Sequence, residues 1–156
     1  MAYAKARQLG LKSRLVLCGA DFQNGELKKF CRRLDLEKEV CFTGLVTPGK
    51  ARQLMRHCLF FALFSRFESF GMAPLEAMSC GKATLLSGAG GMKDFARNRR
   101  NTLLAPILDP NNAARLMLRL EREVKLRKKL EIAALKTAAA YSWPIIAGRY
   151  ERFYRG

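Results

Sequence analysis

Two glutamates, Glu68 and Glu76, stand eight positions apart on either side of a Phe70–Gly71 pair, within the segment 65–91. Gly71 can adopt a positive φ at no steric cost and lets the backbone come close to a ligand. The N–H groups of a first helical turn have no partner inside the helix, so a helix that follows a glycine-containing loop offers an anion-binding site. The pattern predicts anion binding, with one carboxylate in the loop and the other about one turn into the helix.

The elements around this loop must place both carboxylates. The apolar run 59–64 predicts a buried strand that ends at the loop. Pro74 favours a helix that begins between residues 72 and 74, because proline lacks the N–H that the first helical turn leaves unpaired anyway. A strand, a glycine-containing loop and a helix N-terminus thus follow one another, which is a phosphate-binding arrangement in α/β proteins.

Helical and strand-like patterns alternate along the rest of the chain. We expect helices at 2–10, 26–36, 48–57, 72–79, 111–120, 122–139 and 144–154, and strands at 14–18, 39–43, 59–64 and 83–86, with a short edge strand at 101–105. Such alternation implies an α/β fold in which a parallel sheet carries helices on both faces. Ligands bind at the carboxyl ends of such strands, where the loops lie. Because no repeat or linker interrupts the chain, we expect one domain over residues 1–156.

The sequence ESFGMAPLE, which begins at Glu68 and continues as AMSCGKATLLSGAGG, resembles the donor-binding signature of retaining glycosyltransferases of family four. These enzymes have two Rossmann-like domains, and the resemblance covers most of this chain as the C-terminal, nucleotide-sugar-binding one. It implies transfer of a hexosyl group from a UDP-, GDP- or similarly activated sugar to a glycan or lipid-linked acceptor. No cofactor beyond the donor is implied, and no metal ion, since the chain has no D-x-D pair.

The resemblance also implies roles for individual residues. Glu76 would accept hydrogen bonds from the ribose hydroxyls of the nucleotide, and Glu68 would lie beside the donor sugar, where it stabilises an oxocarbenium-like transition state. The implied donor-binding residues are Ser69, Phe70, Gly71, Met72, Ala73, Glu76, Gly90 and Gly91, with Glu68 as the catalytic candidate. The backbone N–H groups around 70–73 would face the diphosphate. The glycine pair would let sugar hydroxyls approach the backbone.

Some positions carry further expectations. Thr102 stands where a glycine usually follows Asn101 in the family, so we expect it to narrow the pocket for the nucleotide base. Trp143 matches a Ser-Trp pair that opens the family's last helix, and we expect it in the core. In the family this domain opens with a strand, loop and helix that supply an Arg and a Lys to the diphosphate, and an N-terminal domain supplies the acceptor site. We expect this chain to be a partial domain that lacks both that first strand and the N-terminal domain, and to be inactive alone. Either the remaining strands close up or another chain covers them.

The net charge of +16 predicts an acidic partner. Basic residues cluster at 28–33, 97–100 and 119–129; the last cluster fits either a solvated face or a basic helix that lies on an anionic membrane. There are two alternatives to a donor-binding domain: a scaffold module for a partner chain, and a basic nucleic-acid-binding protein. The apolar residues of 145–154 favour the scaffold module, and they also favour self-association. Five cysteines without a C-x-x-C pair favour a reducing, cytoplasmic setting, with the inner membrane surface as a further candidate location.

Overall fold

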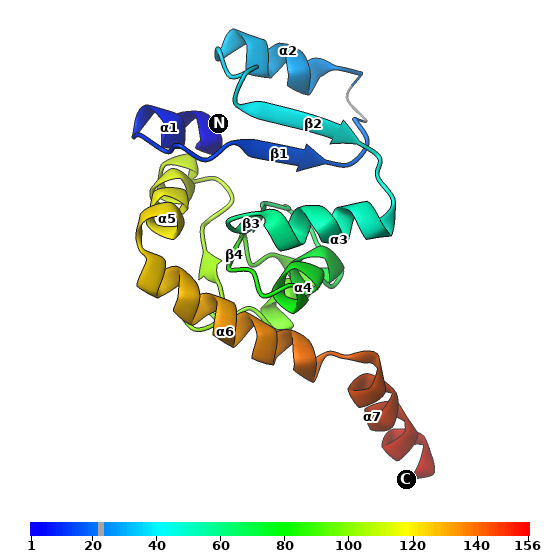
Figure 1. Cartoon of the computed structure of the whole chain (residues 1–156). Coiled ribbons are helices and arrows are strands. Elements are labelled where there is room, and N and C mark those ends of the chain that lie inside the picture. Colours follow the sequence, from blue (N-terminus) through cyan, green and yellow to red (C-terminus); the bar gives the residue numbers. More distant parts are fainter. Residues whose placement is uncertain (22–23) are drawn as a thin grey trace.

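Strands and helices alternate along the chain, and the paired strands run parallel (Figure 1). The structure is a computed structural model that describes residues 1–21 and 24–156. The helices are α1 (Ala2–Gln8), α2 (Glu26–Arg33), α3 (Pro48–His57), α4 (Met72–Ser79), α5 (Pro110–Arg122), α6 (Val124–Ala140), α7 (Trp143–Arg155) and the 3₁₀ helix η1 (Gly90–Asp94); the strands are β1 (Leu15–Cys18), β2 (Val40–Gly44), β3 (Phe61–Leu63), β4 (Thr84–Leu86) and β5 (Leu103–Leu104). The predicted α/β fold is confirmed, and α3 and α4 have the predicted bounds.

Local signals explain where several helices begin. Thr47 caps α3 and Asp109 caps α5, each with a side-chain oxygen that accepts the backbone N–H three residues later, at 3.3 and 2.8 Å. A proline follows each cap, at Pro48 and Pro110, where its fixed φ suits the first helical turn. At α4 the cap is Gly71, whose φ of +100° no other residue type adopts easily. These signals lie within a few residues of each helix start, which is why the sequence predicts them well.

The strands form two hydrogen-bonded sheets. β1 pairs with β2, and β3, β4 and β5 form a second sheet in that order. Among the described strands no ladder joins β1 to β3, so these strands do not close up into one sheet. Instead, one hydrophobic cluster holds both sheets against the same helices: Leu15 and Leu17 of β1 and Leu85 of β4 pack with Tyr3 of α1 and Leu120 of α5. Side chains, and not backbone hydrogen bonds, therefore connect the two sheets.

Burial differs sharply between the strands of the two sheets. Every residue of β4, which has a neighbour on each side, is buried. In β1 the side chains alternate between half-buried and exposed, and Val16 is 46% exposed; all of β3 is only half-buried. Interior strands of parallel sheets are normally covered on both faces. β1 and β3 are thus as apolar as interior strands and as exposed as edge strands.

A carboxylate fastens the start of β1 to the far end of α5. Glu121 accepts hydrogen bonds from the backbone N–H groups of Lys12 and Ser13 and from the Ser13 hydroxyl. Partial burial raises the pKa of Glu121, but these hydrogen bonds and the nearby Arg122 outweigh it and hold the pKa below its ordinary value. The contact joins segments more than a hundred residues apart and helps to place α5 over α1.

The last helix leaves the body of the protein (Figure 1). None of the thirteen residues of α7, all of which are described, is buried. Trp143, expected in the core, is 79% exposed, and the expectation is wrong because α7 meets no sheet surface on which the indole could pack. In the described part of the chain, no helix has the length and apolar character needed to cross a membrane.

Candidate functional site

The loop after β3 leads directly into the N-terminus of α4. Gly71 is the left-handed cap, and no side chain caps the helix. Within the described chain, the N–H groups of Met72 and Ala73 have no hydrogen-bond partner, and Pro74 has no N–H to satisfy. The first turn of α4 thus presents two unpaired donors at the positive end of the helix dipole, as an anion requires. The predicted strand, loop and helix unit is present.

The structure brings the two halves of the sequence signature together. The N–H of Gly91 donates to the Glu68 carbonyl oxygen at 2.9 Å. A Cβ on Gly90 would overlap the Glu68 carbonyl oxygen, and one on Gly91 would overlap the Ser69 carbonyl oxygen and lie 2.7 Å from the Phe70 Cα. The absence of a side chain at both glycines therefore lets the backbone of the loop 68–70 pack directly against theirs. The sequence interpretation, that they leave space for sugar hydroxyls, misses this backbone-to-backbone role.

Two aromatic rings from other parts of the chain pack against the ring of Phe70 in the same loop. Phe70 lies 6.1 Å from Phe95 and 5.9 Å from Tyr141 between ring centroids, and Phe95 and Tyr141 are 6.0 Å apart. The Tyr141 hydroxyl donates to the carbonyl oxygen of Asp94, the last residue of η1, at 3.2 Å. Sequence reasoning missed Phe95 and Tyr141, because they lie 25 and 71 positions after Phe70 and nothing local links the three.

A buried amide supports this aromatic group. Asn101 is 7% exposed; its Oδ1 accepts the backbone N–H of Arg97 at 2.7 Å, and its Nδ2 donates to the Phe95 carbonyl oxygen and to the Thr137 hydroxyl, both at 2.8 Å. The amide thereby joins the turn that carries Phe95 to helix α6. Its neighbour Thr102 is fully buried, and its hydroxyl bonds to Thr84 of β4. Thr102 thus lies in the core and lines neither of the cavities described below, contrary to the sequence expectation.

The two carboxylates face different surroundings. Glu68 is half-buried in the loop, whereas Glu76 is exposed on the outer side of α4. Glu76 lines an open cavity of about 920 Å³ between α4, the end of α6 and α7, and a smaller one of about 120 Å³ that α3 closes with Arg52. Glu68, Gly90 and Gly91 line neither cavity. The structure therefore groups Glu68, the glycine pair and the α4 N-terminus, and sets Glu76 one turn further along the helix.

The arrangement suits an anionic ligand that also carries hydroxyl groups. The free donors of α4 can bind phosphate oxygens, and carboxylates on either side can accept from hydroxyl groups. Over the described ranges, no group of three or more His, Cys, Asp or Glu side chains is placed to hold a metal ion.

Comparisons with a family model and with curated proteins point to the same protein family. A sequence model of the family "Glycosyl transferases group 1" matches residues 1–137. A curated relative, mannosylfructose-phosphate synthase of Agrobacterium fabrum, is 30% identical over 123 residues, which are 78% of this chain and 27% of that protein. The chain spans 27 to 39% of the length of the first curated relatives that it matches.

Solved structures agree on the fold. HepE of Anabaena, crystallised in complex with UDP-glucose, superimposes with a TM-score of 0.80 and 26% identity over 88% of this chain and 39% of its own. The C-terminal domain of LpcC, a glycosyl transferase group 1 family protein from Francisella tularensis, superimposes with a TM-score of 0.77 over 89% of this chain and 76% of its own. The identity to LpcC is 21%, so this second likeness shows the fold alone.

Proposed function

The chain belongs to the glycosyl transferases group 1 family, and from this premise we propose that it is the nucleotide-sugar-binding domain of a retaining glycosyltransferase. The observation that carries the proposal is the loop 68–70, which lies on the Gly90–Gly91 backbone and ends at the unpaired N–H groups of α4. The relative crystallised with UDP-glucose supports a UDP-sugar as the donor, with a GDP-sugar as the alternative to be tested.

In the proposed complex, the diphosphate lies at the N-terminus of α4. The N–H groups of Met72 and Ala73 donate to phosphate oxygens, and the helix dipole adds to the attraction. Glu76, one turn further along, accepts from the two ribose hydroxyls. Glu68, in the loop that precedes the helix, lies beside the anomeric carbon, where its carboxylate stabilises the positive charge that develops as the bond to the leaving diphosphate lengthens. We propose no metal ion in this step.

Titration of UDP and GDP into the purified chain at low salt, followed by calorimetry, tests the donor site. We expect saturable binding of one nucleotide and at least about a tenfold weaker Kd for Glu76→Ala, because losing a charged acceptor of two hydroxyl groups costs about 1.5–3 kcal/mol. Glu26→Ala, which removes the same charge from α2, should bind as the wild type does. Heparin controls for simple charge attraction. Equal binding by wild type, Glu76→Ala and heparin would contradict the proposal.

We also propose that the chain alone transfers no sugar. Transfer needs an acceptor site and cations for the diphosphate. At the N-terminus of α4 the unpaired donors are the N–H groups of Met72 and Ala73, whereas Arg52 and Arg149 line the cavities beside Glu76. Sugar transfer by the isolated chain above that of Glu76→Ala would contradict this.

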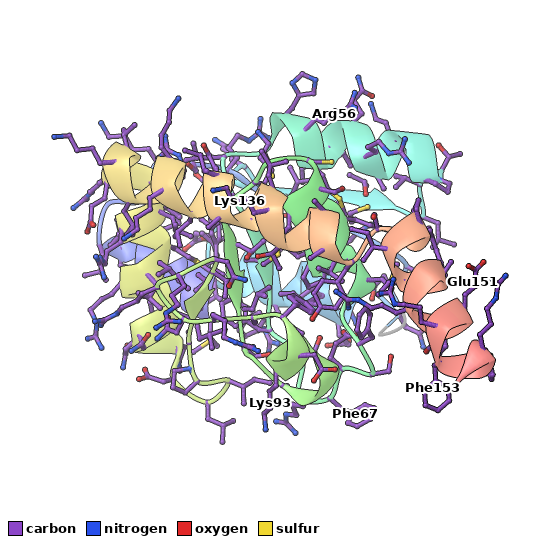
Figure 2. The ribbon with its side chains drawn as sticks, turned by 90° about the horizontal axis from the view of Figure 1, so that it is seen from below. Arg56, Phe67, Lys93, Lys136, Glu151 and Phe153 are labelled. Atoms are coloured by element: carbon purple, nitrogen blue, oxygen red, sulfur yellow. The ribbon has the colours of Figure 1, made fainter. Side chains whose placement is uncertain are left out.

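A second proposal concerns α7, whose apolar face we expect to pack on another polypeptide, in the first instance a second copy of this chain. A helix of this length without tertiary contacts is marginal in water. Yet Tyr150 and Phe153 are 60% and 80% exposed, and Phe153 projects from the same edge of the molecule as Phe67, which is 82% exposed (Figure 2). Apolar side chains of α7 and of the loop after β3 are thus open to contact with another polypeptide.

Sedimentation over a concentration series tests this association. We expect the mean mass to rise with concentration and to rise further with salt, because salt screens the repulsion between two chains of charge +16. Phe153→Ser should remain monomeric, and Leu108→Ser, which replaces a residue that is 80% exposed outside α7, should behave as the wild type. A monomer at every concentration would contradict self-association. A nucleic-acid-binding protein would instead lose its partner as salt increases.

A further inference from the structure

We propose that Tyr141 is a positioning residue, which holds the loop with Glu68 against the turn with Gly91 so that both face one ligand. The proposal rests on the proposed function and adds to it a residue outside the sequence signature. Tyr141 follows α6 directly and comes from a part of the chain that carries none of the predicted site residues. Its contacts reach both segments that build the site.

The first contact is to the loop. The Tyr141 ring lies 5.9 Å from the Phe70 ring, and Phe70 comes two residues after Glu68 and just before the cap of α4. The side chains of Arg66, Phe67 and Ser69 are exposed, so they do not fix the loop in the core. The Phe70 ring, which packs against the hydrophobic cluster of Leu75 and Met78, is therefore an apolar side chain through which packing can hold this loop in place.

The second contact is to the turn after β4. The Tyr141 ring lies 6.0 Å from Phe95, and its hydroxyl donates to the Asp94 carbonyl oxygen at 3.2 Å. Asp94 ends η1, which begins at the glycine pair. One side chain thus holds the two segments whose backbones meet at the Gly91 N–H to Glu68 carbonyl bond. Aromatic pairs of this geometry stabilise beyond their buried area.

The consequence for binding is geometric. The unpaired N–H groups of Met72 and Ala73 and the Glu68 carboxylate can act on one ligand only while the loop and α4 keep their relative positions. The rest of α4 has its own anchors, since Leu75 and Met78 are buried in the core. Loss of the Tyr141 ring should therefore release the loop and leave α4 folded. Loss of a structural tyrosine elsewhere should leave both the loop and α4 in place.

Two pairs of variants test the proposal. Tyr141→Phe removes the hydroxyl bond to Asp94 and keeps the ring, and Tyr141→Leu removes both. Tyr3 is the matched control: it is 8% exposed, and its hydroxyl donates to the Ser13 and Glu39 carbonyl oxygens, in the other hydrophobic cluster. Tyr3→Phe and Tyr3→Leu should lower global stability in the same way without touching the loop. Each variant is followed by amide hydrogen exchange, by urea unfolding and by UDP titration.

For Tyr141→Leu we expect exchange of the hydrogen-bonded N–H groups of Gly91, Met92 and Phe95 to be at least about tenfold faster than in the wild type, and UDP to bind at least about tenfold more weakly. Tyr141→Phe should show a smaller effect of the same pattern. Once its lower global stability is allowed for, Tyr3→Leu should change neither the exchange rates of these N–H groups nor the affinity for UDP.

The proposal would be overturned if Tyr3→Leu and Tyr141→Leu changed hydrogen exchange and UDP affinity in the same way. It would also be overturned if Tyr141→Leu made exchange faster and left the UDP affinity unchanged. If Tyr141→Leu does not fold, an unchanged loop and unchanged affinity in Tyr141→Phe overturn it. If the wild type binds no UDP, the proposed function fails, while hydrogen exchange alone still decides whether Tyr141 holds the loop.

Discussion

Gly91→Ala is expected to cost about 3 kcal/mol of the free energy of unfolding or more, and to abolish nucleotide binding by the protein that still folds. The added Cβ would overlap the Ser69 carbonyl oxygen and lie 2.7 Å from the Phe70 Cα. These are backbone atoms, which cannot rotate away as the end of a flexible side chain can. The loop must therefore move off the turn, and the Gly91 N–H loses its bond to the Glu68 carbonyl oxygen.

The matched control for this variant is Gly49→Ala in α3. A Cβ at Gly49 would meet no atom within 4 Å, and neither Gly49 nor Gly91 has a positive φ. Both substitutions thus add the same methyl group to a backbone that alanine can adopt. In α3 the change should be neutral or stabilise by about 0.5–1 kcal/mol, since alanine favours the helix. Urea unfolding and UDP titration of both variants measure the contrast. A Gly91→Ala protein as stable as the wild type would show that the loop does not lie on this turn.

The contrast between these glycines also indicates what the sequence can predict. The unit of strand, loop and α4 could be predicted because its signals are local: an apolar run, Gly71, and Pro74 in the first helical turn. Their place in the signature makes Gly90 and Gly91 candidates for the site. Their physical task could not be predicted, because it depends on a backbone segment more than twenty positions earlier that the fold brings against them.

The same limit explains the errors. The strand patterns predict parallel strands correctly, yet which strands share a ladder depends on how the chain crosses between them, and β1 and β3 do not meet. Trp143 looks like a core residue by type, but burial of an indole requires a surface to pack on, and α7 has none in this structure. Thr102 can lie in the core because its hydroxyl pairs with that of Thr84 in β4, a partner that no neighbouring residue in the sequence reveals.

Asn101→Ala is expected to cost about 2–4 kcal/mol of the free energy of unfolding, because it leaves buried polar groups without partners. The Asn101 amide accepts a hydrogen bond from the Arg97 N–H and donates to the Phe95 carbonyl oxygen and to the Thr137 hydroxyl, and alanine can replace none of these bonds. Water cannot easily compensate at a position that is 7% exposed. Because the Phe95 carbonyl loses its link to α6, the aromatic group behind the loop should loosen as well.

Asn98→Ala separates this effect from the simple loss of an amide. Asn98 lies in the same turn but is exposed, and among the described residues its Oδ1 accepts one bond, from the Leu104 N–H at 3.0 Å. Its removal should cost at most about 1 kcal/mol, since water can take the freed N–H. Urea unfolding of the two variants compares the same side chain with and without burial. Equal losses would mean that Asn101 acts only through the turn, whereas the expected larger loss would identify it as the buried connection between that turn and α6, on which the position of Phe95 depends.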